Sequence, residues 1–77
     1  MIRYYFDVVT DGEVARDREG VLLPGLDSAR REASLSLAEI ALDQLHSGTF
    51  SRLAVAVRTA DGPVCEAVFQ SDARSLN

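Results

Sequence analysis

The sequence predicts an α+β domain in which one helix packs on a four-stranded, mainly antiparallel sheet, in the order ββαββ. Three observations predict this fold. Apolar and polar residues alternate over residues 2–10, two Asp-Gly pairs stand between strand-like stretches, and a segment with helical spacing follows Pro24-Gly25. Because glycine accepts the positive φ that tight hairpins need, Asp11-Gly12 and Asp61-Gly62 each join antiparallel neighbours. Residues 1–77 then form a single small domain.

The first two strands are expected before the helix. In residues 2–10 the even-numbered side chains point to one face and the odd-numbered to the other, with the aromatic and β-branched residues typical of strands. After the first Asp-Gly turn the chain returns through Val14. Glu19-Gly20 is expected to interrupt this return as a bulge or turn, and Val21 to Leu23 continue it.

The helix is expected from about residue 28 to about residue 46. Asp27 or Ser28 is the candidate N-cap, and Ser47-Gly48 ends the helix. One apolar stripe consists of Ala29, Ala33, Leu37, Ile40 and Ala41. A second stripe, with the spacing of a helix–helix contact, consists of Leu35, Ala38, Leu42 and Leu45. A helix that covers one sheet needs only the first stripe, so the second stripe predicts another partner.

Two further strands follow the helix. Residues 52–59 are the third strand, with Leu53, Val55 and Val57 on one face and Ala54 and Ala56 on the other. Residues 64–70 are the fourth strand, with Cys65, Ala67 and Phe69 expected to face the core. Residues 71–77 are expected to form a flexible tail.

The charge of the chain narrows the classes of partner. All eight basic residues are arginine and lysine is absent, so a Schiff-base or P-loop lysine is excluded. The net charge of −4 argues against broad nucleic-acid binding and against an anionic membrane surface. Cys65 is the one cysteine, which excludes an internal disulfide and fits a cytoplasmic protein. We expect neither a signal peptide nor a membrane span.

Several short motifs occur along the chain: Arg-Tyr-Tyr-Phe-Asp-Val at 3–8, Asp-Arg-Glu-Gly-Val-Leu-Leu-Pro-Gly-Leu at 17–26, Ala-Arg-Arg-Glu-Ala at 29–33, Asp-Gly at 61–62 and Phe-Gln-Ser-Asp-Ala at 69–73. In these motifs the chain resembles a family of short bacterial proteins of unknown function, prevalent in soil and plant-associated bacteria. Its members look like Arg-Tyr-Phe-Phe-His/Asp-Val, Asp-x-Glu-Gly-x-x-Leu-Pro-x-Leu, Ala-x-x-Glu-Ala and Phe-x-x-Asp-Ala. The resemblance implies no established activity. Many members have His at the position of Asp7, so a role of that His does not transfer.

A weaker similarity, at the level of fold, is to the antitoxin subunit of HicAB-type pairs. That subunit also has N-terminal strands, a proline-containing turn, one helix and a returning strand. Leu23-Pro24-Gly25-Leu26 looks like its proline turn, but the chain adds no DNA-binding segment. Likeness of fold is a poor guide to function, so this similarity gives an alternative and not the leading hypothesis.

The polar residues predict no enzyme, no metal site and no cofactor. Asp7, Asp11, Asp17 and Glu19 could meet around the first hairpin, but their spacing does not match an EF-hand loop, and turn chemistry explains them. His46 falls at the helix end, where it suits the helix dipole. Cys65 stands beside Glu66, which disfavours a thiolate.

Two apolar surfaces make a protein interface the leading hypothesis. The candidate contact residues are Tyr5, Val9, Leu35, Ala38, Leu42, Leu45 and Val68, with Ala54 and Ala56 beside the sheet residues. A contiguous exposed apolar patch marks an interaction surface, so we expect a homodimer or an unidentified protein partner. The alternative is an antitoxin-like or nucleic-acid-linked regulator, in which bases stack on sheet aromatics and arginines contact phosphates. Its residues would be Arg3, Tyr5, Arg52 and Arg58.

Overall fold

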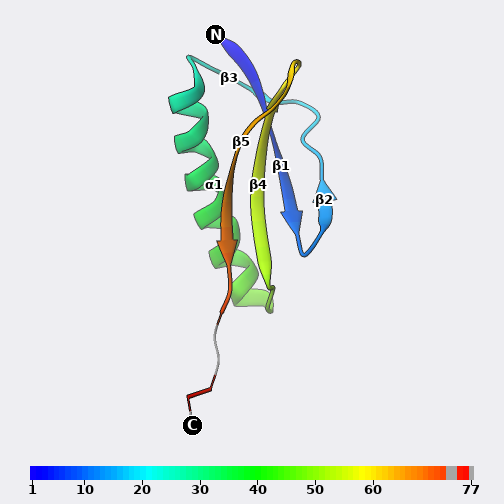
Figure 1. The fold of residues 1–77 in the computed structure, drawn as a ribbon, viewed down its shortest axis with the longest axis vertical. Helices are drawn as coiled ribbons and strands as arrows, with labels where there is room; N and C mark the ends of the chain where they lie inside the picture. Colours follow the sequence, from blue (N-terminus) through cyan, green and yellow to red (C-terminus); the bar gives the residue numbers. More distant parts are fainter. Residues whose placement is uncertain (73–74, 77) are drawn as a thin grey trace.

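The computed structural model describes residues 1–72 and 75–76, in which five strands and one helix form two layers (Figure 1). The elements are β1 (Ile2–Thr10), β2 (Glu13–Ala15), β3 (Val21–Leu23), α1 (Leu26–Ser47), β4 (Arg52–Thr59) and β5 (Gly62–Gln70). The sheet has the order β2–β1–β4–β5, β3 also pairs with β1, and every pairing is antiparallel. The predicted α+β class and the helix on one face are therefore confirmed.

The sheet has five strands and not four because the returning strand is split. Its first part, β2, pairs with Val8–Thr10, and its second part, β3, pairs with Ile2–Tyr4. Between them residues 16–20 leave the ladder, so the break starts before the Glu19-Gly20 pair where the sequence placed it. Between β2 and β3 the carboxylate of Asp17 replaces a strand carbonyl as the partner of β1, and it accepts the Phe6 N–H at 3.1 Å.

The helix is slightly longer than expected. Gly25 is its N-cap and makes no side-chain capping bond, so the expectation that Asp27 or Ser28 caps the helix is wrong. Instead the Gly25 carbonyl accepts the Ala29 N–H at 3.1 Å, and Asp27 lies in the first turn, where a carboxylate favours the helix dipole. At the other end the Gly48 N–H donates to the Gln44 carbonyl at 2.9 Å, as the predicted glycine end requires.

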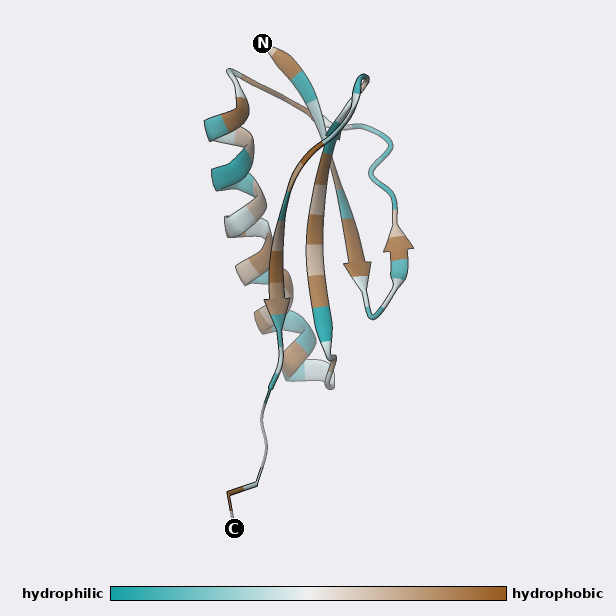
Figure 2. Cartoon of the chain, viewed as in Figure 1, coloured by the Kyte–Doolittle hydropathy of each residue, from teal (hydrophilic) through white to brown (hydrophobic). Residues whose placement is uncertain are grey.

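The core lies between α1 and the sheet. From β4 it takes Leu53, Val55 and Val57, which are fully buried as the alternation predicted. From α1 it takes the first apolar stripe, whose buried members are alanines that let the helix lie close to the strands. Figure 2 shows the apolar residues following β4 and the adjoining strands through the centre of the molecule.

The ends of the described chain add two facts. The Ser71 N–H donates to the Ser51 carbonyl at 2.9 Å, which extends the β4–β5 ladder past Gln70. The expected flexible tail over residues 71–77 falls partly outside the described residues. No helix of the described chain combines the length and the apolar character that crossing a bilayer requires.

Candidate functional site

The second helical stripe is exposed on the side of α1 away from the sheet. Leu35, Leu42 and Leu45 are 51%, 59% and 43% exposed, and Ala38, which completes the stripe, is exposed as well. None of the four belongs to the buried core of the described residues. Large apolar side chains this open to water in a regular row are the strongest candidate contact surface of the chain.

The open face of the sheet carries a second apolar surface. The register aligns Val14, Val9, Ala54 and Val68 in one row across four strands. Val14 and Val68 at the two ends are 57% and 43% exposed, whereas Ala54 is buried. The helical stripe lies on the opposite side of the sheet, so the structure does not join the two predicted surfaces into one.

Tyr5 lies on this open face but away from the row. Its partner across the ladder is Arg58, whose guanidinium carbon stands 4.5 Å above the centre of the Tyr5 ring. A cation over an aromatic face is a favourable contact. Tyr5 therefore has an internal partner, and the apolar character of this face comes mainly from the valine row.

A buried polar network occupies the part of the open face next to Tyr5. Asp7 is 7% exposed, and its Oδ2 accepts a hydrogen bond from Arg58 Nε at 2.9 Å. Arg58 Nη2 also donates to the Asp17 carbonyl at 2.8 Å. The Asp17 N–H donates to Asp7 Oδ1 at 2.9 Å. Three segments far apart in the sequence are thus joined by one ion pair and its hydrogen bonds.

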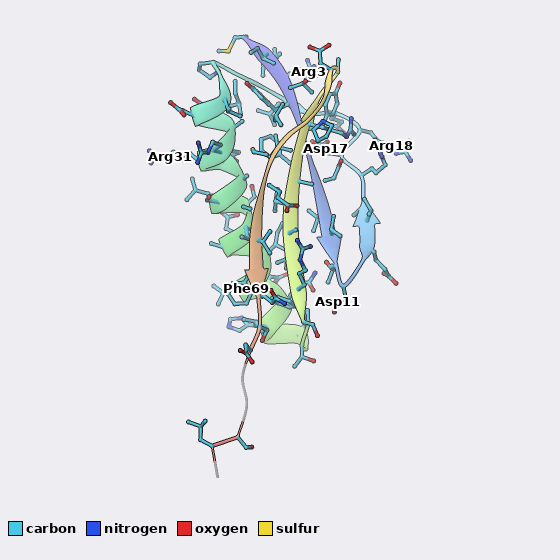
Figure 3. All side chains as sticks on the ribbon, in the orientation of Figure 1. Arg3, Asp11, Asp17, Arg18, Arg31 and Phe69 are labelled. Atoms are coloured by element: carbon cyan, nitrogen blue, oxygen red, sulfur yellow. The ribbon has the colours of Figure 1, made fainter. Side chains whose placement is uncertain are left out.

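Asp17 also fixes the loop that separates β2 from β3. Its Oδ1 accepts the N–H groups of Glu19 and Gly20, at 3.0 Å and 3.1 Å, while its Oδ2 bonds to β1. Figure 3 shows Asp17 and Arg3 at the same end of the molecule. Arg3 reaches across to the Glu19 carbonyl at 2.7 Å. The loop is therefore held against β1 by side chains where strand pairing is absent.

Both carboxylates are held in their charged form. Burial by itself raises the pKa of Asp7, but the hydrogen bonds from Arg58 and from the Asp17 N–H, with the charges of Arg58 and Arg16, outweigh it and lower that pKa. The Gly20 N–H is the main cause of the lowered pKa of Asp17; burial opposes it, and the Phe6 and Glu19 N–H groups reinforce it. The network consequently has structural roles for both acids and no proton to exchange near neutral pH.

We expect the stability of the fold to fall in acid because of these two groups. A folded-state pKa below the ordinary value stabilises the fold above that value, about 3.9 for Asp, and this contribution is lost as the pH falls through the folded-state values. The urea midpoint should be steady from pH 7 to 5 and decline between pH 5 and 3. Asp17→Asn should be less stable at pH 7 and decline less. Parallel curves for the two proteins would contradict this assignment.

The other acidic and nucleophilic candidates do not converge with the network. Asp11 closes the first hairpin with φ at 46° and accepts the N–H groups of Ser51 and Arg52 at 3.0 Å and 2.8 Å. His46 is exposed in the last helical turn, and Cys65 is half-buried beneath α1. Within the described residues no three His, Cys, Asp or Glu side chains gather to hold a metal ion.

The residues of the nucleic-acid alternative are only partly brought together. Arg3, Tyr5 and Arg58 lie near one another, but Arg52 is six β4 residues from Arg58, which is about 20 Å. Arg52 also faces Glu66, with 3.7 Å between Nη2 and Oε1. Each of the three arginines therefore has a partner inside the chain.

An open pocket of about 430 Å³ lies where β1 and the β4–β5 hairpin separate beyond the Tyr5–Arg58 pair. It is lined by Ile2, Arg3, Tyr4, Tyr5, Leu26, Thr59, Ala60, Asp61 and Val64. Apolar side chains dominate, and Arg3 and Asp61 are its charged lining groups. This composition suits contact with an apolar group and offers no paired acid and base for a reaction.

Sequence reasoning missed the network because it explained Asp7 and Asp17 by turn chemistry around the first hairpin. One signal could have suggested it: Asp7 lies between aromatic and β-branched neighbours in the middle of a strand, where aspartate is disfavoured. An aspartate retained there needs a cationic partner, and the sheet supplies Arg58.

Comparison with known proteins places the chain in a family. Residues 3–70 match a family model described as a domain of unknown function, DUF6894, and the chain belongs to that family. The comparison with curated proteins found no match, and the comparison with solved structures found none either. The family model covers the helix and the strands except Ile2, the first residue of β1, and it assigns no activity.

Proposed function

We propose that this chain is a non-enzymatic, cytoplasmic protein-interaction or regulatory module that self-associates as a homodimer. The observation that carries the proposal is the exposed helical stripe, in which Leu35, Leu42 and Leu45 are each more than two-fifths exposed. Burying a leucine side chain contributes about 1.5–3 kcal/mol. A surface that exposes three in one row gains much by covering them with a second copy.

The charged groups of the chain support a non-enzymatic role. Asp7, Asp17 and Arg58 bond to one another or to main-chain groups. Both acids have lowered pKa values, whereas a general acid or base near neutral pH needs a raised one. The alternative of a nucleic-acid-linked or antitoxin-like regulator has less support, because Arg3, Arg52 and Arg58 would have to exchange internal partners for phosphates.

The first test is the absolute mass in solution. Light scattering coupled to size exclusion, over a wide range of concentrations, should give about twice the 8.4 kDa of one chain. A monomer at every concentration would contradict self-association. Adding RNA or DNA at low salt should leave the mass unchanged, and a salt-dependent increase that Arg3→Ala removes would favour the alternative.

Leu42→Glu should weaken self-association while the monomer stays folded. Leu42 is 59% exposed, so the free energy of unfolding of the monomer should change by less than about 0.5 kcal/mol. The dissociation constant should rise at least tenfold, about 1.4 kcal/mol, because a charge then enters an apolar contact twice per dimer. Thr49→Glu adds the same charge at an exposed position beyond the end of the helix and should leave the mass unchanged. Unfolding of Leu42→Glu would place Leu42 in the monomer core instead.

A further inference from the structure

The two edges of the sheet differ in how open they are to another strand. One edge is formed by β2 and β3, which are three residues each and are separated by the loop that Asp17 fixes. The other edge is β5, a single strand of nine residues whose pairing with β4 shifts register once, between Val57 and Arg58. Short, interrupted edge strands prevent pairing with other chains, whereas a long edge strand invites it. The structure therefore protects one edge and leaves the other available.

The main chain of β5 presents a regular set of unpaired groups. The bond from the Ser71 N–H to the Ser51 carbonyl shows which residue pairs of the β4–β5 ladder are hydrogen-bonded. By this alternation the main-chain N–H and C=O groups of Cys65, Ala67 and Phe69 point toward β4. The N–H and C=O groups of the alternate residues, Glu66, Val68 and Gln70, then point outward. No strand of the described chain pairs with that side of β5.

The position of α1 suits pairing at this edge. The helix packs about equally on β4 and β5, so its axis lies above the space between them. Because neighbouring strands are about 4.8 Å apart, that axis is about 2.4 Å inside β5. A second copy paired through its own β5 would place its helix axis about 10 Å away, which is the separation of packed helices.

Only part of the exposed stripe lies near the flank of α1 that would face the second helix. Arg30 and Ser34 stand beside Cys65 and Ala67 at the outer side of β5, so that flank of the helix looks past the edge. At 100° per residue Leu45 and Ala38 come next on the helix surface beyond Ser34, whereas Leu35 and Leu42 lie further round, on the side away from the sheet. Figure 3 shows Arg31, one turn before Leu35, on the side of α1 that points away from the strands.

The direction of the elements fixes how the two helices would run. Since α1 and β5 run in the same direction (Figure 1), antiparallel pairing of β5 makes the two helices antiparallel.

We propose that two copies associate by antiparallel β5–β5 pairing centred on Val68, which joins the sheets and packs α1 against α1. This geometry rests on the proposed self-association and specifies its interface. When the β5–β5 pairing is centred on Val68, Val68 lies opposite Val68 of the second copy and Glu66 lies opposite Gln70. All three residues with outward main-chain groups then take part in the pairing. A centre at Glu66 would oppose two like charges, which is destabilising. The valine row of one open face would continue directly into that of the other.

Cysteine cross-linking tests both the edge and the register. In a hydrogen-bonded antiparallel pair the Cα atoms are about 5.5 Å apart, within the range a disulfide spans. We would place Val68→Cys in a Cys65→Ala background and oxidise with diamide. The matched control is Glu66→Cys in the same background, on the same strand and face, where residue 66 of one copy lies about 13 Å from residue 66 of the other.

The expected result is a covalent dimer for Val68→Cys in high yield and little for Glu66→Cys, with both variants folded and dimeric by light scattering. A stronger cross-link at position 66 would overturn the register. Dimers of correct mass that cross-link at neither position would overturn β5 pairing but leave self-association standing. A monomeric wild-type chain would instead overturn the proposed function, so the two failures are distinguishable.

Discussion

Replacing Asp7 by alanine will lower the free energy of unfolding by about 3–5 kcal/mol. The change removes the carboxylate that pairs with Arg58 at 2.9 Å, in a position only 7% exposed, and leaves the guanidinium without its counter-charge. It also removes the acceptor of the Asp17 N–H. The loop of residues 16–20 then loses one of its attachments to the sheet together with the ion pair.

Urea unfolding followed by circular dichroism measures this loss, and a double-mutant cycle assigns it. Arg58→Met keeps an apolar stem over Tyr5 and removes the charge. If the ion pair carries the effect, the double variant should be more stable than the sum of the two single losses implies, by at least 1 kcal/mol, or about fivefold in the unfolding equilibrium. Additive losses would mean that Asp7 and Arg58 act independently. Asp7→Asn keeps an acceptor oxygen and should lose less than alanine.

The main elements of this fold were predictable because their signals are local. Alternation over residues 2–10 and 52–59 defines two strands. Each of the two Asp-Gly turns then defines the connection from one of these strands to the strand that follows it. The two apolar stripes of α1 could also be separated by spacing alone, and the structure places one in the core and the other in solvent. A short-range period is enough for such assignments.

The split of the returning strand and the buried network could not be predicted in this way. Asp7, Asp17 and Arg58 are 10 to 51 residues apart in the sequence, and only the completed sheet brings them together. Alternation correctly put Asp7 on the face away from α1, but it cannot show that a loop covers that part of the face. The burial of Asp7 is a property of the tertiary arrangement.

The candidate interface shows a similar division. The spacing of apolar residues identified the exposed stripe. The apolar arc of the helix is wider than one sheet can cover, and this width can be read from the sequence. The β5 edge was not identified, because whether a strand is central or at an edge depends on the order of strands in space. That order, β2–β1–β4–β5, gives the chain one protected and one open edge.

Gly20→Ala will lower the free energy of unfolding by about 2–5 kcal/mol. Gly20 has φ at 72°, and this left-handed conformation costs about 1–2 kcal/mol for alanine. A Cβ there would also lie 2.9 Å from the Tyr4 carbonyl oxygen and 2.9 Å from Arg3 Cγ, and such overpacking costs about 1–3 kcal/mol more. The Arg3 side chain can move, but the Tyr4 carbonyl belongs to β1 and cannot move without disturbing the strand.

Gly12→Ala is the matched control, since it separates the two contributions. Gly12 also has positive φ, at 90°, but no heavy atom lies within 4 Å of its added Cβ. It should therefore lose only the conformational part, about 1–2 kcal/mol. Thermal or urea unfolding of both variants gives the difference, which is the contribution of the close contact between the loop and β1. Equal losses would mean that Gly20 is needed for its conformation alone, whereas a larger loss at Gly20 supports the close packing of the loop that separates β2 from β3.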